Sequence, residues 1–250
     1  MFIDERARAH LAATTRFGDV RFVEVTDSTN RVVADLAAAG APEGVVVVAE
    51  FQTAGRGRLN RRWEAPPGTA VTASVLLRPG GLPSARWHLV TAAVALAARQ
   101  ACTQVAGFTP EVKWPIDLLV GERKLAGVLA EAMGGAVVVG LGWNVSAAPQ
   151  GAVSAEDAAG HPVDRGALLT GWLEALDRRC GQWDDVAAEY RRVCATVGRQ
   201  VRVERPGGSL RGTAVSIDSD GRLVVRPASG AAIAVSAGDV THVRPAGADW

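Results

Sequence analysis

The sequence predicts an α+β protein with a mixed, mainly antiparallel sheet and packed helices over residues 1–197, followed by a small β barrel over residues 198–250. Three strand-like segments follow one another closely between residues 111 and 145. Strands joined by such short links pair antiparallel, because parallel neighbours need a long crossover. From Gly198 onward, short alternating strands separated by glycine-containing turns are typical of a small all-β barrel.

The elements of the larger domain follow from their hydrophobic patterns. Residues 20–25 alternate as a strand, and residues 31–40 are helix-like, with Gly40 placed to end the helix in the left-handed conformation. The alanine-rich segment 84–105 lacks Gly and Pro and predicts a long helix. We expect further strands at residues 44–52, 69–78, 111–120, 124–132 and 135–145, a mobile loop at 147–164, and helices at 165–182 and 184–196.

The composition disfavours several classes of function. Lysine and arginine number 27 against 26 aspartates and glutamates, so the chain lacks the basic excess of duplex-binding proteins, and no nucleic-acid partner is expected. No apolar run reaches the roughly 18–20 residues of a membrane span, and the charged N-terminus lacks the features of a secretory signal. We therefore expect a cytoplasmic protein without a membrane partner, whose three cysteines are reduced thiols.

The chain contains only two lysines, Lys113 and Lys124, and they lie eleven residues apart. Lysine carries a compact, mobile point charge, whereas arginine is a rigid planar fork. A chain that uses arginine almost everywhere else therefore indicates that these two positions need an ammonium group. Chance clustering of two rare residues is the alternative.

We call residues 52–63, QTAGRGRLNRRW, the arginine loop. Gly55 and Gly57 let the backbone approach a ligand closely, and Arg56 and Arg58 point the same way in an extended chain. Such a loop suits a carboxylate or phosphate if it is partly desolvated, because charge-assisted arginine bonds are about twice as strong as neutral ones. If the loop is fully exposed, each pair is worth only about 0–1 kcal/mol and the loop is merely a solvated surface.

Other familiar sites for nucleotides, metals and nucleophiles are absent from the sequence. No glycine is followed by lysine, which excludes a P-loop, and the segment GLGWNV lacks the third glycine and the helix of a dinucleotide fingerprint. The four histidines are scattered, without a triad or a metal-binding spacing. We assign no side chain as a metal ligand.

Five short patterns follow one another over residues 27–144. Their residues are Asp27 to Asn30 of D-S-T-N; Gly55, Arg56, Gly57, Arg58, Arg61 and Trp63 of G-R-G-R-x-G-R-x-W; Lys113, Trp114, Pro115 and Asp117 of K-W-P-N-D; Lys124 to Gly127, Leu129 and Glu131 of K-L-A-G-I-L-x-E; and Gly140, Gly142 and Asn144 of G-x-G-x-N. In these patterns the chain resembles the biotin protein ligases, which activate biotin with ATP and attach it to a lysine of a carrier protein.

The resemblance implies a catalytic domain related to class II aminoacyl-tRNA synthetases and a C-terminal barrel of the SH3 type. It implies biotin and ATP as substrates, Mg²⁺ held through the phosphates, and the biotin carboxyl carrier domain of an acyl-CoA carboxylase as the partner. The implied catalytic residues are Lys124, Arg58, Lys113 and Asp117. The implied biotin contacts are Ser28, Thr29, Asn30, Gln52, Gly55, Arg56, Gly57, Lys124, Gly127 and Leu129, and the implied ATP or adenylate contacts are Arg56, Arg58, Arg61, Trp63, Lys113, Ile116 and Asn144.

Elementary chemistry gives these residues roles. The biotin carboxylate must attack the α-phosphate of ATP, and the two anions repel, so cations must neutralise both while holding them about 3–3.5 Å apart. Arg56, Arg58 and Arg61 are the candidates, and Lys124 is expected at the bridging oxygen as pyrophosphate leaves. The acceptor lysine must then lose a proton, for which Asp117 is the candidate base; the alternative is that Asp117 caps a turn after Pro115.

Three positions depart from the family patterns. Asn60 replaces a glycine, and asparagine is the non-glycine residue that best tolerates positive φ. Ile116 replaces the asparagine of K-W-P-N-D, so a lost hydrogen bond to the nucleotide is expected to weaken binding by about 1–3 kcal/mol. Trp143 stands where an aliphatic residue is common, and we expect it either to reshape the same region or to stack on adenine.

Several alternatives stay open on the sequence. Ile116 leaves room for a degenerate paralogue that binds biotin or adenylate without turnover, or for a ligase of a different acyl group. An RNA- or DNA-binding module that uses the arginine loop is a third reading, which the neutral net charge disfavours. The roughly 20 residues before the first strand are too few for the helix-turn-helix of bifunctional relatives. The oligomeric state is unknown, although residues 135–145 could pair between chains as an edge strand.

Overall fold

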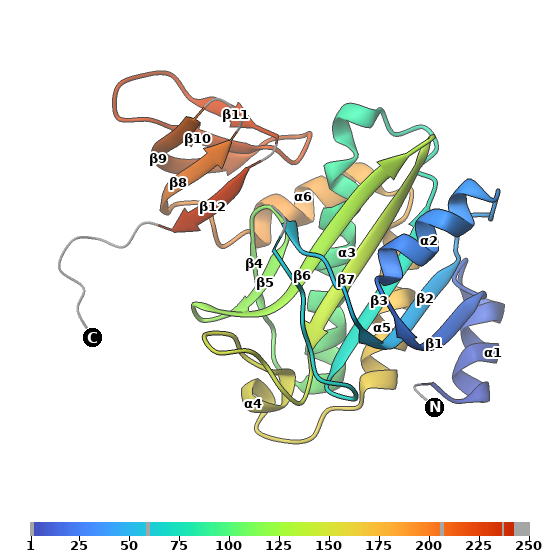
Figure 1. Cartoon of the computed structure of the whole chain (residues 1–250). Coiled ribbons are helices and arrows are strands. Elements are labelled where there is room, and N and C mark those ends of the chain that lie inside the picture. Colours follow the sequence, from blue (N-terminus) through green and yellow to red (C-terminus); the bar gives the residue numbers. More distant parts are fainter. Residues whose placement is uncertain (1–2, 59–60, 206–207, 237, 243–250) are drawn as a thin grey trace.

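The computed structural model describes residues 3–58, 61–205, 208–236 and 238–242. It contains a larger helix-and-sheet part and a small C-terminal sheet (Figure 1). The elements are α1 (Glu5–Thr14), β1 (Val20–Thr26), α2 (Thr29–Ala38), β2 (Val46–Gln52), β3 (Ala70–Leu77), η2 (Ser84–Arg86), α3 (His88–Ala101), η3 (Cys102–Ala106), β4 (Glu111–Lys113), β5 (Asp117–Val120), β6 (Arg123–Met133), β7 (Ala136–Asn144), α4 (Ala155–Ala159), α5 (Arg165–Arg179), α6 (Trp183–Val193), β8 (Gln200–Arg205), β9 (Gly208–Ile217), β10 (Leu223–Arg226), β11 (Ile233–Val235) and β12 (Asp239–His242).

The larger sheet has seven strands in the order β1-β2-β3-β7-β6-β5-β4. Strands β1 and β2 run parallel, with α2 as the crossover between them, and every other pairing is antiparallel. The helix α2 ends as expected, since Gly40 two residues beyond it has a φ of 87°. The prediction of a mixed, mainly antiparallel sheet is confirmed.

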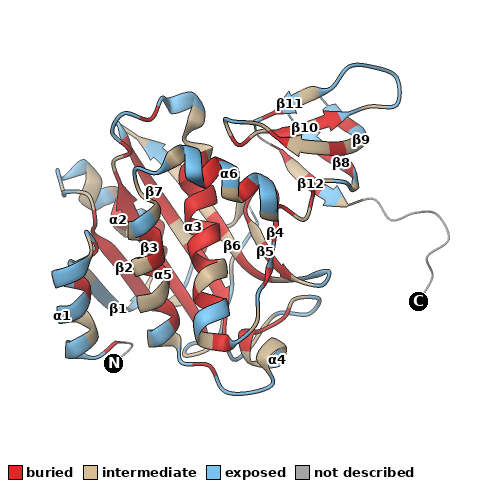
Figure 2. Ribbon diagram, turned by 180° about the vertical axis from the view of Figure 1, so that it is seen from behind, coloured by how far each residue is buried: buried red, intermediate tan, exposed pale blue. Residues whose placement is uncertain are grey.

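Helices cover both faces of this sheet. The main core packs α3 and α5 against one face, and a smaller core packs α2 against the other (Figures 1 and 2). The segment 84–106 is long and apolar enough for a membrane span by length and composition, which corrects the expectation that no such run exists. Of its most apolar 18-residue window, 72% is buried, and Figure 2 shows α3 as the buried central helix of the core. That burial is typical of the core helix of a globular domain.

Two strand predictions are corrected. Residues 111–120 do not form one strand, because Trp114 and a cis-linked Pro115 turn the chain and β4 pairs antiparallel with β5 as a hairpin. Strand β7 is not an edge strand, because it lies between β3 and β6 at the centre of the sheet. It therefore has no free edge with which to pair between chains.

The C-terminal sheet has five strands in the order β11-β10-β9-β8-β12. Backbone carbonyls of the β9–β10 region accept hydrogen bonds from the larger part: Gly221 O from Trp114 Nε1 at 3.3 Å and Ile217 O from Arg191 Nε at 2.8 Å. The sheet therefore docks on the larger part next to the β4–β5 turn. The domain boundary at residues 197 and 198 remains a prediction.

Candidate functional site

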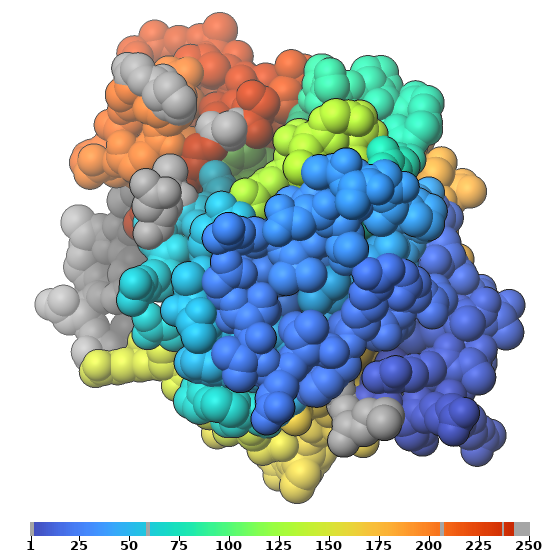
Figure 3. Space-filling model, turned by 45° about the vertical axis from the view of Figure 1, so that its right-hand side comes forward, coloured from blue at the N-terminus to red at the C-terminus, as the bar shows by residue number. Residues whose placement is uncertain are grey.

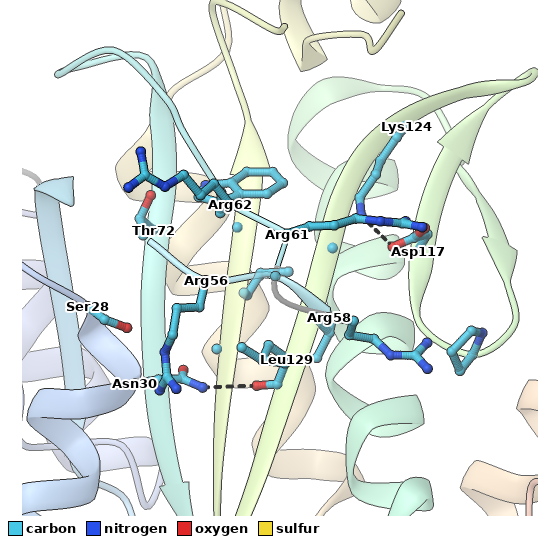
Figure 4. A pocket seen from close by; sticks show the side chains of 18 of the residues that line it. Ser28, Asn30, Arg56, Arg58, Arg61, Arg62, Thr72, Asp117, Lys124 and Leu129 are labelled. Atoms are coloured by element: carbon cyan, nitrogen blue, oxygen red, sulfur yellow. Dashed lines mark hydrogen bonds and ion pairs between the residues drawn. The ribbon is translucent and has the colours of Figure 1, made fainter. Parts of the chain in front are cut away.

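A pocket opens over the middle of the larger sheet, where β3, β6 and β7 meet the arginine loop and the β4–β5 hairpin (Figure 4). The N-terminal end of α2 and the start of β12 complete its wall. Fourteen of the seventeen site residues predicted from the sequence line it: Ser28, Thr29, Asn30, Gln52, Arg56, Gly57, Arg58, Arg61, Trp63, Lys113, Asp117, Lys124, Gly127 and Leu129.

Both lysines of the chain line this pocket, from β4 and β6, the strands on either side of β5. The Lys124 Nζ lies 2.7 Å from Asp117 Oδ1 (Figure 4). The two side chains are 42% and 30% exposed, so solvent screens the pair and it is worth about 0–1 kcal/mol. Asp117 therefore orients Lys124 in the pocket but binds it only weakly. The sequence did not predict this ion pair.

Gly127 makes room for this ion pair. A Cβ atom at Gly127 would lie 2.7 Å from Lys124 Nζ, 2.9 Å from Lys124 Cε and 3.4 Å from Asp117 Oδ1. The ammonium therefore occupies the space that any larger residue on β6 would fill.

The arginine loop is partly buried by the C-terminal sheet. Arg58 Nη2 donates to Gly238 O at 2.6 Å, and Arg61 Nη2 forms an ion pair with Asp239 at the start of β12. Figure 3 shows this sheet, coloured orange to red, on the same side of the molecule as the segment that carries the loop. Burial lowers the pKa of Arg58, so its charge is less well solvated than in water and an anion beside it would be stabilised. Asn60, the departure in this loop, lies outside the described residues.

Trp63 ends the arginine loop and packs on Gly142 of β7. A Cβ atom at Gly142 would lie 2.3 Å from Trp63 Cε2. The backbone of Trp63 closes the loop at its other end, because Trp63 N donates to Gly55 O at 3.0 Å. Trp63 Nε1 is buried and has no hydrogen-bond partner within the described residues.

Polar side chains gather where α2 begins. Thr29 donates from its backbone N to Gln52 Oε1 at 2.7 Å, and its Oγ1 lies 3.1 Å from the same oxygen. Because the Gln52 carbonyl is occupied, its amide nitrogen is the group that remains for a ligand. Ser28, Thr29 and Asn30 are all buried, at 3–5% exposure.

Three predicted site residues do not line this pocket, and their ligand contacts remain predictions. Ile116 is 5% exposed and packs in the main hydrophobic core. Asn144 is buried beneath the pocket, where its Nδ2 donates to Val153 O at 3.3 Å and lies 3.5 Å from Lys124 O. Gly55 lies beneath Trp63, whose carbonyl oxygen would be 2.3 Å from a Cβ there. Trp143 is also fully buried in the main core, on the face of β7 opposite Gly142, and does not stack in the pocket.

Ten residues of the pocket wall are not among the predicted site residues: Arg62, Thr72, Trp114, Pro115, Val128, Gly140, Leu141, Gly142, Asp239 and Val240. Thr72 and Arg62 had a usable signal, since Thr72 is a polar residue within an apolar strand and Arg62 lies in the arginine loop. Asp239 and Val240 had none, because only docking of the C-terminal sheet brings them to the pocket.

The charge of the pocket wall is strongly positive. Six cationic side chains line it, namely Arg56, Arg58, Arg61, Arg62, Lys113 and Lys124, against the carboxylates of Asp117 and Asp239. Cations gathered in a partly enclosed pocket stabilise a polyanion such as a triphosphate. Among the described residues there is no cluster of three or more His, Cys, Asp or Glu that would hold a metal ion.

Comparison with known proteins agrees with this geometry. Residues 22–145 match the biotin/lipoate A/B protein ligase family, and residues 196–243 match the biotin protein ligase C-terminal domain. A biotin–[acetyl-CoA-carboxylase] ligase of Mycobacterium tuberculosis is 37% identical over 257 residues, which cover 97% of this chain and 96% of that protein. The chain belongs to the biotin protein ligase family.

Solved structures of biotin protein ligases share the fold. The enzyme from Aquifex aeolicus in complex with biotin and ATP superposes with a TM-score of 0.78 at 24% identity, over 92% of this chain and 100% of that one. The enzyme from Leishmania major in complex with biotinyl-5-AMP gives 0.61 at 25% identity, over 88% and 99%. The family and the fold predicted from the five patterns are confirmed.

Proposed function

We propose that this chain activates biotin with ATP as biotinyl-5′-adenylate and transfers the biotinyl group to a lysine of a biotin carboxyl carrier domain. The observation that carries the proposal is the pocket itself. It combines a buried polar end, suited to a small neutral head group, with a cationic end, suited to a carboxylate and a triphosphate. The 37% identical relative is named as a biotin–[acetyl-CoA-carboxylase] ligase, which supports the same substrates.

In the first step the biotin carboxylate attacks the α-phosphate of ATP and pyrophosphate leaves. We assign Lys124 and Lys113 to the two anions that meet, and Arg56, Arg58 and Arg61 to the phosphates, because these cations line one pocket wall. Their charges offset the repulsion and the charge that grows on the leaving pyrophosphate. Magnesium bound through the phosphates would share in neutralising them.

At the polar end, Ser28, Thr29 and Gln52 are assigned to the ureido ring of biotin. Gly127 and Leu129 of β6 and Gly57 of the loop are assigned to the walls around it. Trp63 is assigned to the adenylate, since it lines the pocket at the end of the arginine loop. Asn144 supports the site from below, through its contacts near the Lys124 and Val153 carbonyls.

In the second step the acceptor lysine attacks the mixed anhydride and AMP leaves. A lysine amine has a reference pKa of about 10.4, so a base must take its proton near neutral pH. We assign this role to Asp117, whose carboxylate lines the pocket. When Lys124 turns to the anionic substrates, its weak pair with Asp117 is exchanged and the carboxylate is free to accept a proton.

The departure at Ile116 does not favour a degenerate paralogue. Its side chain packs in the core and does not line the pocket, so no ligand contact of that side chain is lost. We therefore propose an active enzyme of the cytoplasm, with a catalytic domain at residues 1–197 and an SH3-like domain at residues 198–250.

The proposal is tested with the full chain, biotin, Mg·ATP and an isolated biotin carboxyl carrier domain. We expect the carrier to gain the mass of one biotinyl group, and a carrier whose acceptor lysine is replaced by arginine to gain none. Adenylate formation without transfer to any carrier domain would overturn the second step. Transfer of another acyl group in preference to biotin would overturn the assigned substrate.

A further inference from the structure

We propose that Glu131, on β6 outside the pocket wall, is a positioning residue for biotin recognition. It accepts at the end of a buried hydrogen-bond chain that begins at Thr29, and the same carboxylate oxygen holds Arg56 of the arginine loop. This inference rests on the proposed function, because it takes the Thr29 end of the pocket as the place for the ureido ring.

The hydrogen-bond chain crosses the sheet through four side chains, those of Thr29, Ser74, Asn30 and Glu131. Thr29 Oγ1 and Ser74 Oγ lie 2.7 Å apart, and Ser74 Oγ lies 2.7 Å from Asn30 Oδ1. Asn30 Nδ2 donates to Glu131 Oε2 at 2.8 Å and lies 3.3 Å from Leu129 O (Figure 4). Three of the four members are buried, with 0–4% exposure, so these bonds lie in a low dielectric and are costly to leave unmade.

A glycine on the central strand β7 leaves the space that this hydrogen-bond chain occupies. A Cβ atom at Gly140 of β7 would lie 2.2 Å from Asn30 Oδ1 and 3.2 Å from Ser74 Oγ. Gly140 therefore lets the Asn30 amide reach across β7 between Ser74 on β3 and Glu131 on β6. A larger residue at position 140 would break the hydrogen bond between Ser74 and Asn30.

The carboxylate of Glu131, together with the Leu129 carbonyl, fixes the orientation of the Asn30 amide. Paired with Arg56 Nη2 at 2.8 Å, Glu131 only accepts, so Asn30 must present its amide nitrogen there and its oxygen to Ser74. Ser74 has one hydroxyl hydrogen, which it gives to Asn30 Oδ1 or to Thr29 Oγ1, and the Thr29 hydroxyl donates its own hydrogen to Gln52 Oε1 at 3.1 Å. The Thr29 oxygen then offers the pocket a lone pair.

The result is an acceptor and a donor side by side. Thr29 Oγ1 offers a lone pair, while Gln52 offers its amide nitrogen, because its oxygen already accepts from Thr29 N. A ureido group presents an N–H beside a C=O, which matches this pair.

Glu131 also joins the two ends of the pocket. Its Oε2 accepts both from Asn30, at the end of the ureido-side chain, and from Arg56 of the arginine loop. Figure 4 shows the Arg56 side chain reaching toward Asn30. Recognition of the ring and placement of the loop therefore depend on one carboxylate.

The test measures the dissociation constant of biotin by calorimetry for the wild type, Glu131→Gln, Ser74→Ala and the double variant. Glutamine keeps the shape but offers either an amide N–H or a neutral oxygen to Asn30, so we expect about tenfold weaker binding. Because both single changes break one chain, the double variant should bind no more weakly than the weaker single variant. Glu189→Gln is the control, since it neutralises a carboxylate of similar exposure that pairs with Arg179 far from the pocket.

Steady-state kinetics provide the second readout. Glu131→Gln should raise KM for biotin about tenfold and leave the rate at saturating biotin within about threefold, because the residue does not touch the reacting atoms. Two results would overturn the role of Glu131 but not the proposed function. One is a biotin affinity of Glu131→Gln within twofold of the wild type; the other is a double variant whose loss of affinity equals the sum of the two single losses. A wild type that does not bind biotin would overturn the proposed function and this role with it.

Discussion

The position of the Lys124 ammonium depends on Gly127, whose missing side chain leaves room for it. Gly127→Ala places a methyl group where the Lys124 ammonium lies, and the far end of that lysine can move aside. We predict a fall in pyrophosphate release of about ten- to a hundredfold with little loss of stability, because small misplacements of a catalytic group have such effects. Gly171→Ala is the matched control, since its nearest neighbour would be 3.6 Å away and the methyl group fits. Equal rates in the two variants would contradict the role of Lys124.

Arg58 is the loop residue that the C-terminal sheet holds, through Gly238 O. Arg58→Gly removes both the guanidinium and this bond, so the loop should close less firmly over the adenylate. We predict faster escape of biotinyl-5′-adenylate, by about tenfold, and less selective labelling of lysines on other proteins. The dissociation rate of preformed adenylate measures this directly, and an unchanged rate would refute the clamp.

On the central strand β7, the Trp63 ring packs directly against Gly142. Gly142→Ala should displace the tryptophan, because the rigid ring cannot share the space and the loop moves more easily than a central strand. We predict weaker adenylate binding by about 1–3 kcal/mol. In a Trp63→Ala background the same change should have no further effect, and an undiminished effect there would place the damage in the strand itself.

Strand and helix positions followed from periodicity, but their arrangement explains which predictions were wrong. The short links between residues 111 and 145 correctly indicated antiparallel pairing, and fourteen of the predicted site residues line one pocket. The sequence could not show that β3 would pair with β7 and place it in the centre, because that pairing spans about 65 residues. For the same reason it could not show that Ile116 and Trp143 face the core, or that Asp239 reaches the arginine loop.

At the scale of the whole molecule, the docked C-terminal sheet makes stability depend on pH. His242 Nε2 lies 3.2 Å from Thr196 Oγ1, which accepts from Trp114 N at 3.0 Å. Burial, with Lys113 and Arg199 nearby, lowers the pKa of His242 to about 4. In the unfolded chain the pKa of a histidine is about 6.5, so between these values the unfolded state binds more protons.

Stability should therefore fall as pH drops from about 6.5 towards 4. We predict that the urea midpoint decreases over this window and that His242→Gln makes the decrease smaller. His161→Gln, at an exposed histidine, is the control and should leave the slope unchanged. If the urea midpoint of His242→Gln fell with pH as steeply as that of the wild type, His242 would not be the cause of the pH dependence.

The central claim is that one pocket holds biotin and ATP and joins them. The most direct measurement is biotin-dependent release of pyrophosphate from Mg·ATP by the wild type, Lys124→Ala and Arg123→Ala, the last being an exposed neighbour on β6 outside the pocket wall. We predict release by the wild type and Arg123→Ala, and release at least a hundredfold slower, by about 2.7 kcal/mol or more, from Lys124→Ala. Biotin binding by a folded wild type that releases no pyrophosphate would contradict the claim.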